Sequence, residues 1–300
     1  EKSEILSHQI KKTVIHSDKR FTYQEAQDII DNGKGLFSNE LLVLDRLSKI
    51  LRKKRFSSGS INFDRQEVKF ILDKDNNPTD VFFKKSIDTN HLIEEFMLMA
   101  NKIVAKKIGF VKKGEKEKTF VYRVHDKPDE DKINSLNTII KKFGYSINQT
   151  SPKNLSTSLN TLLKNVKGKS ESNMIETLTI RSMSKAIYTT NNIGHYGLNF
   201  KYYSHFTSPI RRYPDLIVHR LLEKYLSGEK SVEKNKIEDI CKYTSEKEKD
   251  AAMAERDSIK YMQTKFLQDK VGGIFEGVIS GVTEWGIYVE LEKNKCEGLV

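Results

Sequence analysis

The densest group of chemically versatile side chains lies between His195 and Arg220. This run reads HYGLNFKYYSHFTSPIRRYPDLIVHR and contains two adjacent arginines, three histidines and several hydroxyl-bearing side chains. Guanidinium groups and the free amides at the start of a helix are groups that bind phosphate in proteins. The run therefore predicts a phosphate site that includes Arg211 and Arg212.

Two other kinds of chemistry fit this run poorly. Ser208 has His205 three residues before it, but no carboxylate that would orient the histidine is evident, and a serine hydrolase needs one. The histidines also lack the i, i+4 spacing of a metal site. Cys241 and Cys296 lie far apart and form no Cys-x-x-Cys motif, so we expect reduced thiols rather than a zinc site.

Helical spacing and turn residues predict the elements that position this run. Thr22 opens a helix that ends at Gly33, and Ser38 is a candidate cap for the next helix. Pro209 suits the first turn of a helix in which Pro214 can form a kink. The other helices are expected from Thr89 and over 130–143, 153–166, 171–187 and 232–270. Strands are expected over 11–17, 60–63, 67–73, 81–85 and 119–124.

The second predicted helix ends in a basic cluster, Lys49 and Arg52–Arg55. Cations stabilise the C-terminal end of a helix, so the cluster either faces solvent there or contacts a nucleic-acid backbone. After Gly272–Gly273 the pattern changes to short glycine-punctuated strands, which favour an antiparallel barrel.

Composition narrows the class of protein. Fifty-two Lys and Arg against 41 Asp and Glu leave a net charge of +11, which favours a polyanionic partner such as nucleic acid, although a general lysine bias gives the same excess. No apolar run reaches the ~18 residues of a membrane span, so we expect no membrane protein. The two cysteines, expected to be reduced thiols, favour a cytoplasmic protein. Because residue 1 is Glu1 rather than Met, and the chain stops inside an apolar run, we also expect a piece of a longer protein.

The run at 195–220 closely resembles the signature of the RNase R and RNase II family of hydrolytic exoribonucleases, in its RNB catalytic domain. The match is nearer to RNase R. The residues after Gly272 resemble the start of an S-one-type OB-fold domain. The resemblance implies an α+β fold, with an RNB domain over 1–270 and a truncated OB barrel over 271–300. Five further segments match in the same order: 13–27, 61–70, 91–101, 124–130 and 254–272.

The resemblance implies processive 3′-to-5′ degradation of single-stranded RNA to nucleoside 5′-monophosphates by a monomer. It also implies magnesium held by aspartates upstream of the VIHSD segment, but no aspartate precedes Val14. The acidic residues of 125–132 suit an exposed turn rather than a substitute metal site. We therefore expect no metal ligands in this chain and no activity of the chain alone. The alternative is a non-catalytic RNA-binding or regulatory protein with the same fold.

Individual roles follow from the resemblance, residue by residue. Arg211 matches the arginine that contacts the scissile phosphate, and Arg212 is a second candidate. Glu95 and Glu255 match acidic positions along the RNA path, although Glu255 could equally form a surface ion pair. In the OB barrel, Trp285 and Tyr288 match aromatic residues that stack on bases. We expect Trp285 to be exposed, whereas Tyr288 could instead belong to the core.

Overall fold

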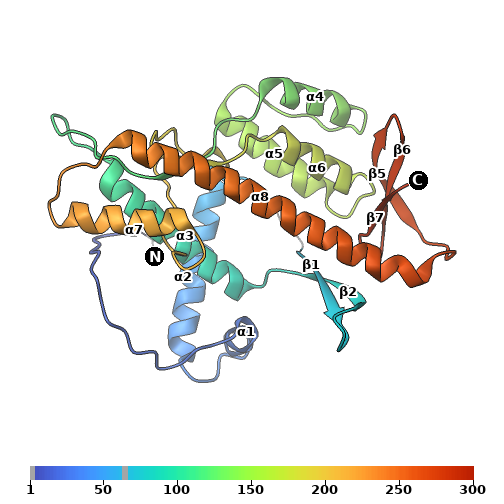
Figure 1. Ribbon diagram of the computed structural model, residues 1–300, viewed down its shortest axis with the longest axis horizontal. Coiled ribbons are helices and arrows are strands. Elements are labelled where there is room, and N and C mark those ends of the chain that lie inside the picture. The colour runs from blue at the N-terminus through green and yellow to red at the C-terminus, as the bar shows by residue number, and fades with distance from the viewer. Residues whose placement is uncertain (1–3, 63–66) are drawn as a thin grey trace.

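The computed structural model describes residues 4–62 and 67–300, and it combines helices with three small antiparallel sheets (Figure 1). The predicted α+β class is confirmed. The helices are α1 (Tyr23–Asn32), α2 (Ser38–Ser57), α3 (Asp88–Gly109), α4 (Glu130–Lys141), α5 (Pro152–Val166), α6 (Ser172–Ser182), α7 (Tyr213–Leu226) and α8 (Lys234–Leu267), with short 3-10 helices η1 (Tyr196–Leu198) and η2 (Gln268–Lys270). The strands are β1 (Glu67–Leu72), β2 (Pro78–Lys84), β3 (Tyr122–Val124), β4 (Ile187–Thr189), β5 (Gly277–Thr283), β6 (Gly286–Leu291) and β7 (Glu297–Leu299).

Helix α1 begins and ends where the sequence predicts. Thr22 Oγ1 accepts a hydrogen bond from the amide of Glu25 at 3.2 Å, and the Glu25 carboxylate accepts the amide of Thr22 at 2.6 Å. This reciprocal pair is a capping box, which satisfies two amides that the helix leaves free. Gly33 ends the helix at φ 67°, a left-handed conformation that glycine adopts without strain.

The predicted cap of α2 is wrong. Ser38 is the first residue inside the helix, and Phe37 occupies the capping position at φ 56° without a side-chain hydrogen bond. The ring of Phe37 packs edge-on against that of Phe21, with centroids 6.5 Å apart. This contact between the partly exposed rings is the side-chain interaction that Phe37 makes where the chain enters α2.

Other expectations also differ from the structure. The helix expected over 171–187 ends at Ser182 as α6, and Ile187 begins strand β4. Residues 11–17 form no strand, and Val14 and Ile15 lie exposed with no partner strand beside them. Residues 60–62 are likewise not a strand, and residue 63 lies outside the described residues. Helix α7 begins at Tyr213 rather than at Pro209, with Pro214 in its first turn. Proline lacks the amide that an inner helical position must donate, so a helix begins at Pro214 more readily than it continues through it.

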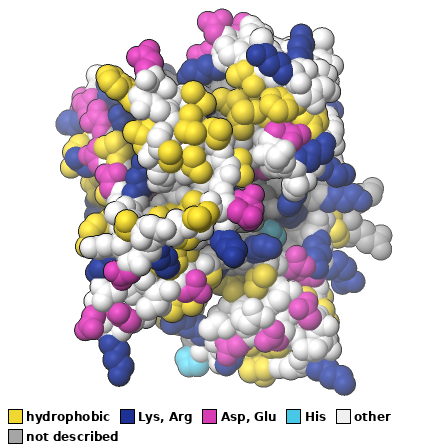
Figure 2. Space-filling view, turned by 90° about the vertical axis from the view of Figure 1, so that its right-hand side faces the viewer, with side chains coloured by type: hydrophobic (Ala, Val, Ile, Leu, Met, Phe, Trp, Pro, Cys, Tyr) yellow, Lys and Arg dark blue, Asp and Glu magenta, His cyan; other side chains and the backbone are white. Residues whose placement is uncertain are grey.

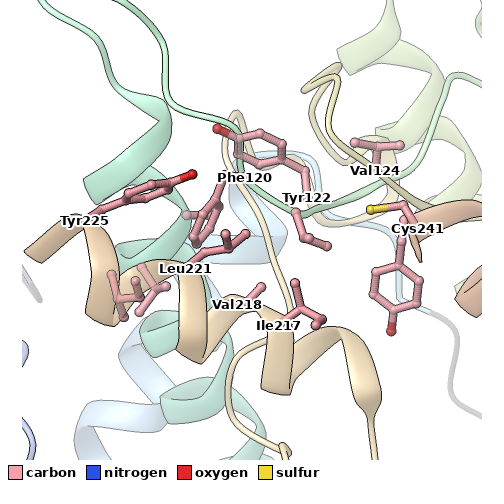
Figure 3. Packing of buried hydrophobic residues seen from close by; sticks show 13 residues of the cluster. Phe120, Tyr122, Val124, Ile217, Val218, Leu221, Tyr225 and Cys241 are labelled. Atoms are coloured by element: carbon pink, nitrogen blue, oxygen red, sulfur yellow. The ribbon is translucent and has the colours of Figure 1, made fainter. Parts of the chain in front are cut away.

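The core that supports the 195–220 run lies between α7, the residues around β3, and the start of α8. Figure 3 shows Val218 and Leu221 of α7 beside the rings of Phe120 and Tyr122. Cys241 of α8 belongs to the same cluster and is a free, buried thiol. A second cluster holds α4, α5 and α6 together through Ile133, Leu136, Ile140, Leu159, Leu162, Val166 and Ile175.

Helix α8 runs the length of the molecule and ends near the sheet of β5, β6 and β7 (Figure 1). It contacts α7, β4 and β2 along its course. Only Cys241 and Thr244 are buried in it, both in its first third, and the rest is largely exposed. Within the described residues, no helix is long and apolar enough to cross a membrane.

Candidate phosphate-binding site

The two predicted arginines lie on one loop but in different surroundings. We call residues 205–212 the arginine loop; it leads directly into α7. The Arg211 side chain is exposed, and its Nη2 donates to Ser208 Oγ at 3.3 Å. Arg212 is half-buried, and its Nη2 donates to Asp215 Oδ1 at 2.8 Å. Arg211 is therefore accessible from solvent, whereas Arg212 is paired with a buried carboxylate.

Side chains from two helices hold the arginine loop. Asn101 Oδ1, on α3, accepts the amides of Phe206 and Thr207 at 2.9 and 3.2 Å. Asp215 Oδ1, on α7, accepts the amide of Ser208 at 2.8 Å. Asn101 and Asp215 are fully buried, at 2% and 0% exposure. The sequence analysis predicts a role for neither residue. Asn101 lies about a hundred positions before the loop it holds, so no local pattern connects the two.

A group of histidine and tyrosine rings adjoins the loop. We call His125, His195, His205, Tyr188 and Tyr203 the histidine cluster. Neighbouring rings lie 5.0–5.6 Å apart, from His125 through His195, Tyr203 and His205 to Tyr188. His125 directly follows β3, Tyr188 lies on β4, and His195 caps the start of η1. Tyr203 and His205 lie between η1 and α7, so sequence spacing does not predict the cluster.

Burial makes the histidines of this cluster weak bases. It lowers the pKa of His195 to about 3, with His125 and Arg123 adding to the effect. It lowers the pKa of His205 to about 2, helped by the positive charges of Arg212 and Arg123. Both histidines are therefore neutral at physiological pH, because a charged ring is costly to remove from water.

The geometry also excludes a serine-hydrolase arrangement at Ser208. His205 Nδ1 lies 2.7 Å from the hydroxyl of Tyr188. The hydroxyl of Ser208 instead accepts from Arg211. A nucleophilic serine needs a histidine within hydrogen-bond reach, so Ser208 is not activated in this way.

Across 4–62 and 67–300, no three His, Cys, Asp or Glu side chains gather closely enough to hold a metal ion. In the acidic segment at 125–132, Asp129 caps α4 by accepting the amide of Lys132 at 3.2 Å. Asp126 Oδ1 accepts the amide of Lys127, so these carboxylates serve local turns.

The other predicted site residues lie on separate elements. Glu95 is buried at 4% exposure and paired with Arg55 of α2, so part of the basic cluster predicted at the end of α2 is internal. Glu255 is exposed on α8. Trp285, between β5 and β6, is 86% exposed, as expected, and Tyr288 on β6 is half-buried.

Figure 2 shows Lys and Arg side chains around a hollow on one face of the molecule.

Comparison with known proteins identifies the fold. Residues 1–228 match the model of the RNB domain. The chain belongs to the RNB domain family. Ribonuclease R of Aquifex aeolicus is 36% identical over 315 aligned residues, which cover 100% of this chain and 43% of that protein.

Solved structures with the same RNB fold include Mycoplasma genitalium RNase R in complex with ribose-methylated single-stranded RNA. It has a TM-score of 0.82 and 26% identity, over 93% of this chain and 45% of that one. The structure of yeast Ssd1, a pseudonuclease, shares the fold alone, with a TM-score of 0.67 and 20% identity over 92% of this chain and 35% of that one. This RNB-family chain thus spans less than half the length of each of these relatives.

Proposed function

We propose that the protein containing this chain is a 3′-to-5′ exoribonuclease that hydrolyses single-stranded RNA processively to nucleoside 5′-monophosphates. The observation that carries the proposal is the alignment of the entire chain with a protein named Ribonuclease R at 36% identity. The solved relative with RNA bound favours the same class of substrate.

Arg211 is the proposed ligand of the scissile phosphate. Its side chain is exposed and lies on a loop whose backbone is held from the interior. A guanidinium fork matches two phosphate oxygens at once. Negative charge increases on those oxygens as water attacks, so a fixed guanidinium stabilises the transition state more than the bound RNA.

The proposal assigns binding to further residues of the chain. Trp285 has the exposed ring that stacking on a base requires, and Tyr288 lies on the adjoining strand. Glu255 lies on the exposed part of α8 and could line the RNA path. The role of Glu95 along the RNA path remains a prediction. The neighbouring Glu94 is the more accessible carboxylate, with 44% of its side chain exposed. The enzyme is proposed to act as a monomer.

We propose that the magnesium implied by the family resemblance takes its ligands from outside the described residues. Within the described residues, no three His, Cys, Asp or Glu side chains gather in one place. We therefore propose that this chain supplies phosphate and RNA contacts and is inactive by itself. Release of mononucleotides by the isolated chain in magnesium would contradict this part of the proposal.

A second function deserves a test because the RNB-like fold also occurs in a protein described as a pseudonuclease. The alternative is a protein that binds RNA without cleaving it. The two functions agree on RNA binding and differ only in turnover.

The deciding experiment uses the full-length protein and two labelled forms of one single-stranded RNA, with and without magnesium. A 3′-to-5′ exonuclease releases a labelled mononucleotide at once from RNA labelled in its 3′ nucleotide. From 5′-labelled RNA a processive enzyme gives a short 5′-terminal end product beside the remaining full-length strand, with few products of intermediate length. Binding without either product supports the non-catalytic alternative, and early mononucleotide release from 5′-labelled RNA contradicts the proposed direction.

A further inference from the structure

The arginine loop owes its conformation to side chains outside it. Its own backbone supplies a turn in which the amides of Arg211 and Arg212 both donate to the carbonyl of Ser208, at 3.3 and 3.0 Å. The preceding amides, those of Phe206, Thr207 and Ser208, all donate to side-chain oxygens instead. Three successive amides bound in this way leave the loop little freedom.

Asn101 holds the first part of the loop from α3. One oxygen, Asn101 Oδ1, accepts two of the three amides, and Asn101 Nδ2 donates to the hydroxyl of Tyr203 at 3.3 Å. His219 of α7 adds a contact: its Nε2 lies 2.8 Å from the carbonyl oxygen of Phe206, and the two rings stack with centroids 4.1 Å apart.

Asp215 holds the second part of the loop from α7. Its Oδ1 accepts both the amide of Ser208 and Nη2 of Arg212, each at 2.8 Å. Yet among the described residues Asp215 Oδ2 and Arg212 Nε are buried without a hydrogen-bond partner. A buried carboxylate with one unbonded oxygen is costly, and a fully paired Arg–Asp contact would stabilise the fold better. The arrangement suits positioning of the loop better than it suits stability.

Ser208 transmits this constraint to Arg211. Its amide is fixed by Asp215, its carbonyl accepts the amide of Arg211, and its hydroxyl accepts from the Arg211 guanidinium. We infer that Asn101 and Asp215 are positioning residues: they fix the backbone of the arginine loop and thereby place Arg211 against the scissile phosphate. This inference rests on the proposed function, because it needs Arg211 to act on a phosphate.

The test measures single-turnover cleavage and equilibrium RNA binding of the full-length protein. Asn101→Leu keeps the approximate shape but removes the acceptor of two amides. Asn101→Asp keeps an acceptor oxygen, and the hydroxyl of Tyr203 can turn to donate to it. Asp215→Asn keeps an acceptor for Ser208 but removes the charge that holds Arg212. We expect Asn101→Leu and Asp215→Asn to slow cleavage by roughly tenfold to a hundredfold, since small misplacements of a catalytic group have effects of this size.

Asn101→Asp should recover most of the rate, and RNA affinity should change by less than about threefold in all three variants if the loop acts on the transition state. Asn137→Leu is the matched control, because Asn137 Oδ1 accepts the amide of Ile147 at 3.1 Å beside the second core cluster. The control should leave the cleavage rate unchanged. If Asn101→Leu does not fold, the cleavage rate of Asp215→Asn provides the test.

Repeating the substitutions in an Arg211→Ala background separates positioning from general damage. With no guanidinium left to place, Asn101→Leu and Asp215→Asn should slow cleavage no further. The inference is overturned if their effects persist there, or if Asn101→Leu slows cleavage no more than Asn137→Leu does. If Arg211→Ala itself leaves cleavage unchanged, the proposed role of Arg211 fails and this inference fails with it.

Discussion

Arg55 on α2 and Glu95 on α3 form an ion pair inside the protein, with Arg55 Nε 2.9 Å and Nη2 2.5 Å from the same oxygen, Glu95 Oε1. Their side chains are only 6% and 4% exposed. Arg55 Nη1 also donates to Ser60 Oγ at 3.3 Å, and Ser60 Oγ in turn donates to the carbonyl of Gly197 at 3.1 Å. The pair therefore connects α2 and α3 with the start of the 195–220 run.

Loss of one member of this pair should destabilise the protein strongly. Glu95→Gln leaves the guanidinium of Arg55 buried with only the partly exposed Glu94 to balance its charge. We expect the free energy of unfolding to fall by about 3 kcal/mol. Urea unfolding measures it, with Glu246→Gln on the exposed part of α8 as a control that should change stability by less than about 0.5 kcal/mol. Equal effects of the two substitutions would mean that the buried pair contributes no more than a surface charge.

Arg211 should affect turnover more than binding. Arg211→Ala is expected to lower kcat roughly a hundredfold, equivalent to about 3 kcal/mol of transition-state stabilisation, because a preorganised donor acts mainly on developing charge. Arg211→Lys should recover only part of the rate, since an ammonium cannot hold two phosphate oxygens in one plane. Single-turnover cleavage and RNA affinity on the same strand separate the two effects. A tenfold loss of affinity with unchanged cleavage would identify Arg211 as a binding contact only.

Acid should destabilise the protein through His195 and His205. The pKa values of these histidines are about 3 and about 2 in the folded protein, whereas a histidine in the unfolded chain has a pKa near 6.5. Below pH ~6.5 the unfolded chain binds protons that the folded protein excludes, so stability falls as the pH falls toward the folded values. Between pH 7 and pH 5 the loss should be about 2 kcal/mol for each histidine.

Urea unfolding of wild-type protein and His205→Asn at both pH values measures this loss. Asparagine can replace Nδ1 of His205 as the partner of the Tyr188 hydroxyl, so the variant should keep the local hydrogen bond. It should lose only the contribution of His205 to the pH dependence, about 2 kcal/mol. An unchanged pH dependence in the variant would show that His205 does not contribute to it.

RNA binding should weaken as salt rises, and the slope of log K against log salt should be proportional to the number of lysines that contact phosphates. Lys102 and Lys106 lie one turn apart on α3. Desolvation lowers the pKa of Lys102, and the positive charges of Lys106 and Lys54 lower it further. If both contact phosphates, their substitution by glutamine should reduce the slope of log K against log salt by about 1.4. Lys141→Gln with Lys142→Gln, at the exposed end of α4, is the control pair. Equal slopes for the two double variants would exclude α3 as an RNA-backbone contact.

Neighbouring residues alone account for helix α1 and for the family resemblance. Thr22, Glu25 and Gly33 are enough to begin and end α1, because capping depends on neighbouring residues. The 195–220 run identified the family, since its residues are contiguous. The sequence also marked Arg211, but it placed α7 one proline too early and gave Ser38 a capping role that Phe37 occupies instead.

The burial of polar side chains and their long-range partners are seen only in the folded protein. Arg55 belongs to a basic cluster that the sequence predicts to face solvent or to contact RNA. In the structure it is buried against Glu95, 40 residues away in sequence. Asn101 meets the arginine loop across more than a hundred residues, and His125 reaches His195 only after β3 and β4 pair. Such contacts bring together side chains that share no local periodicity, so they follow from the packing of whole elements rather than from any stretch of sequence.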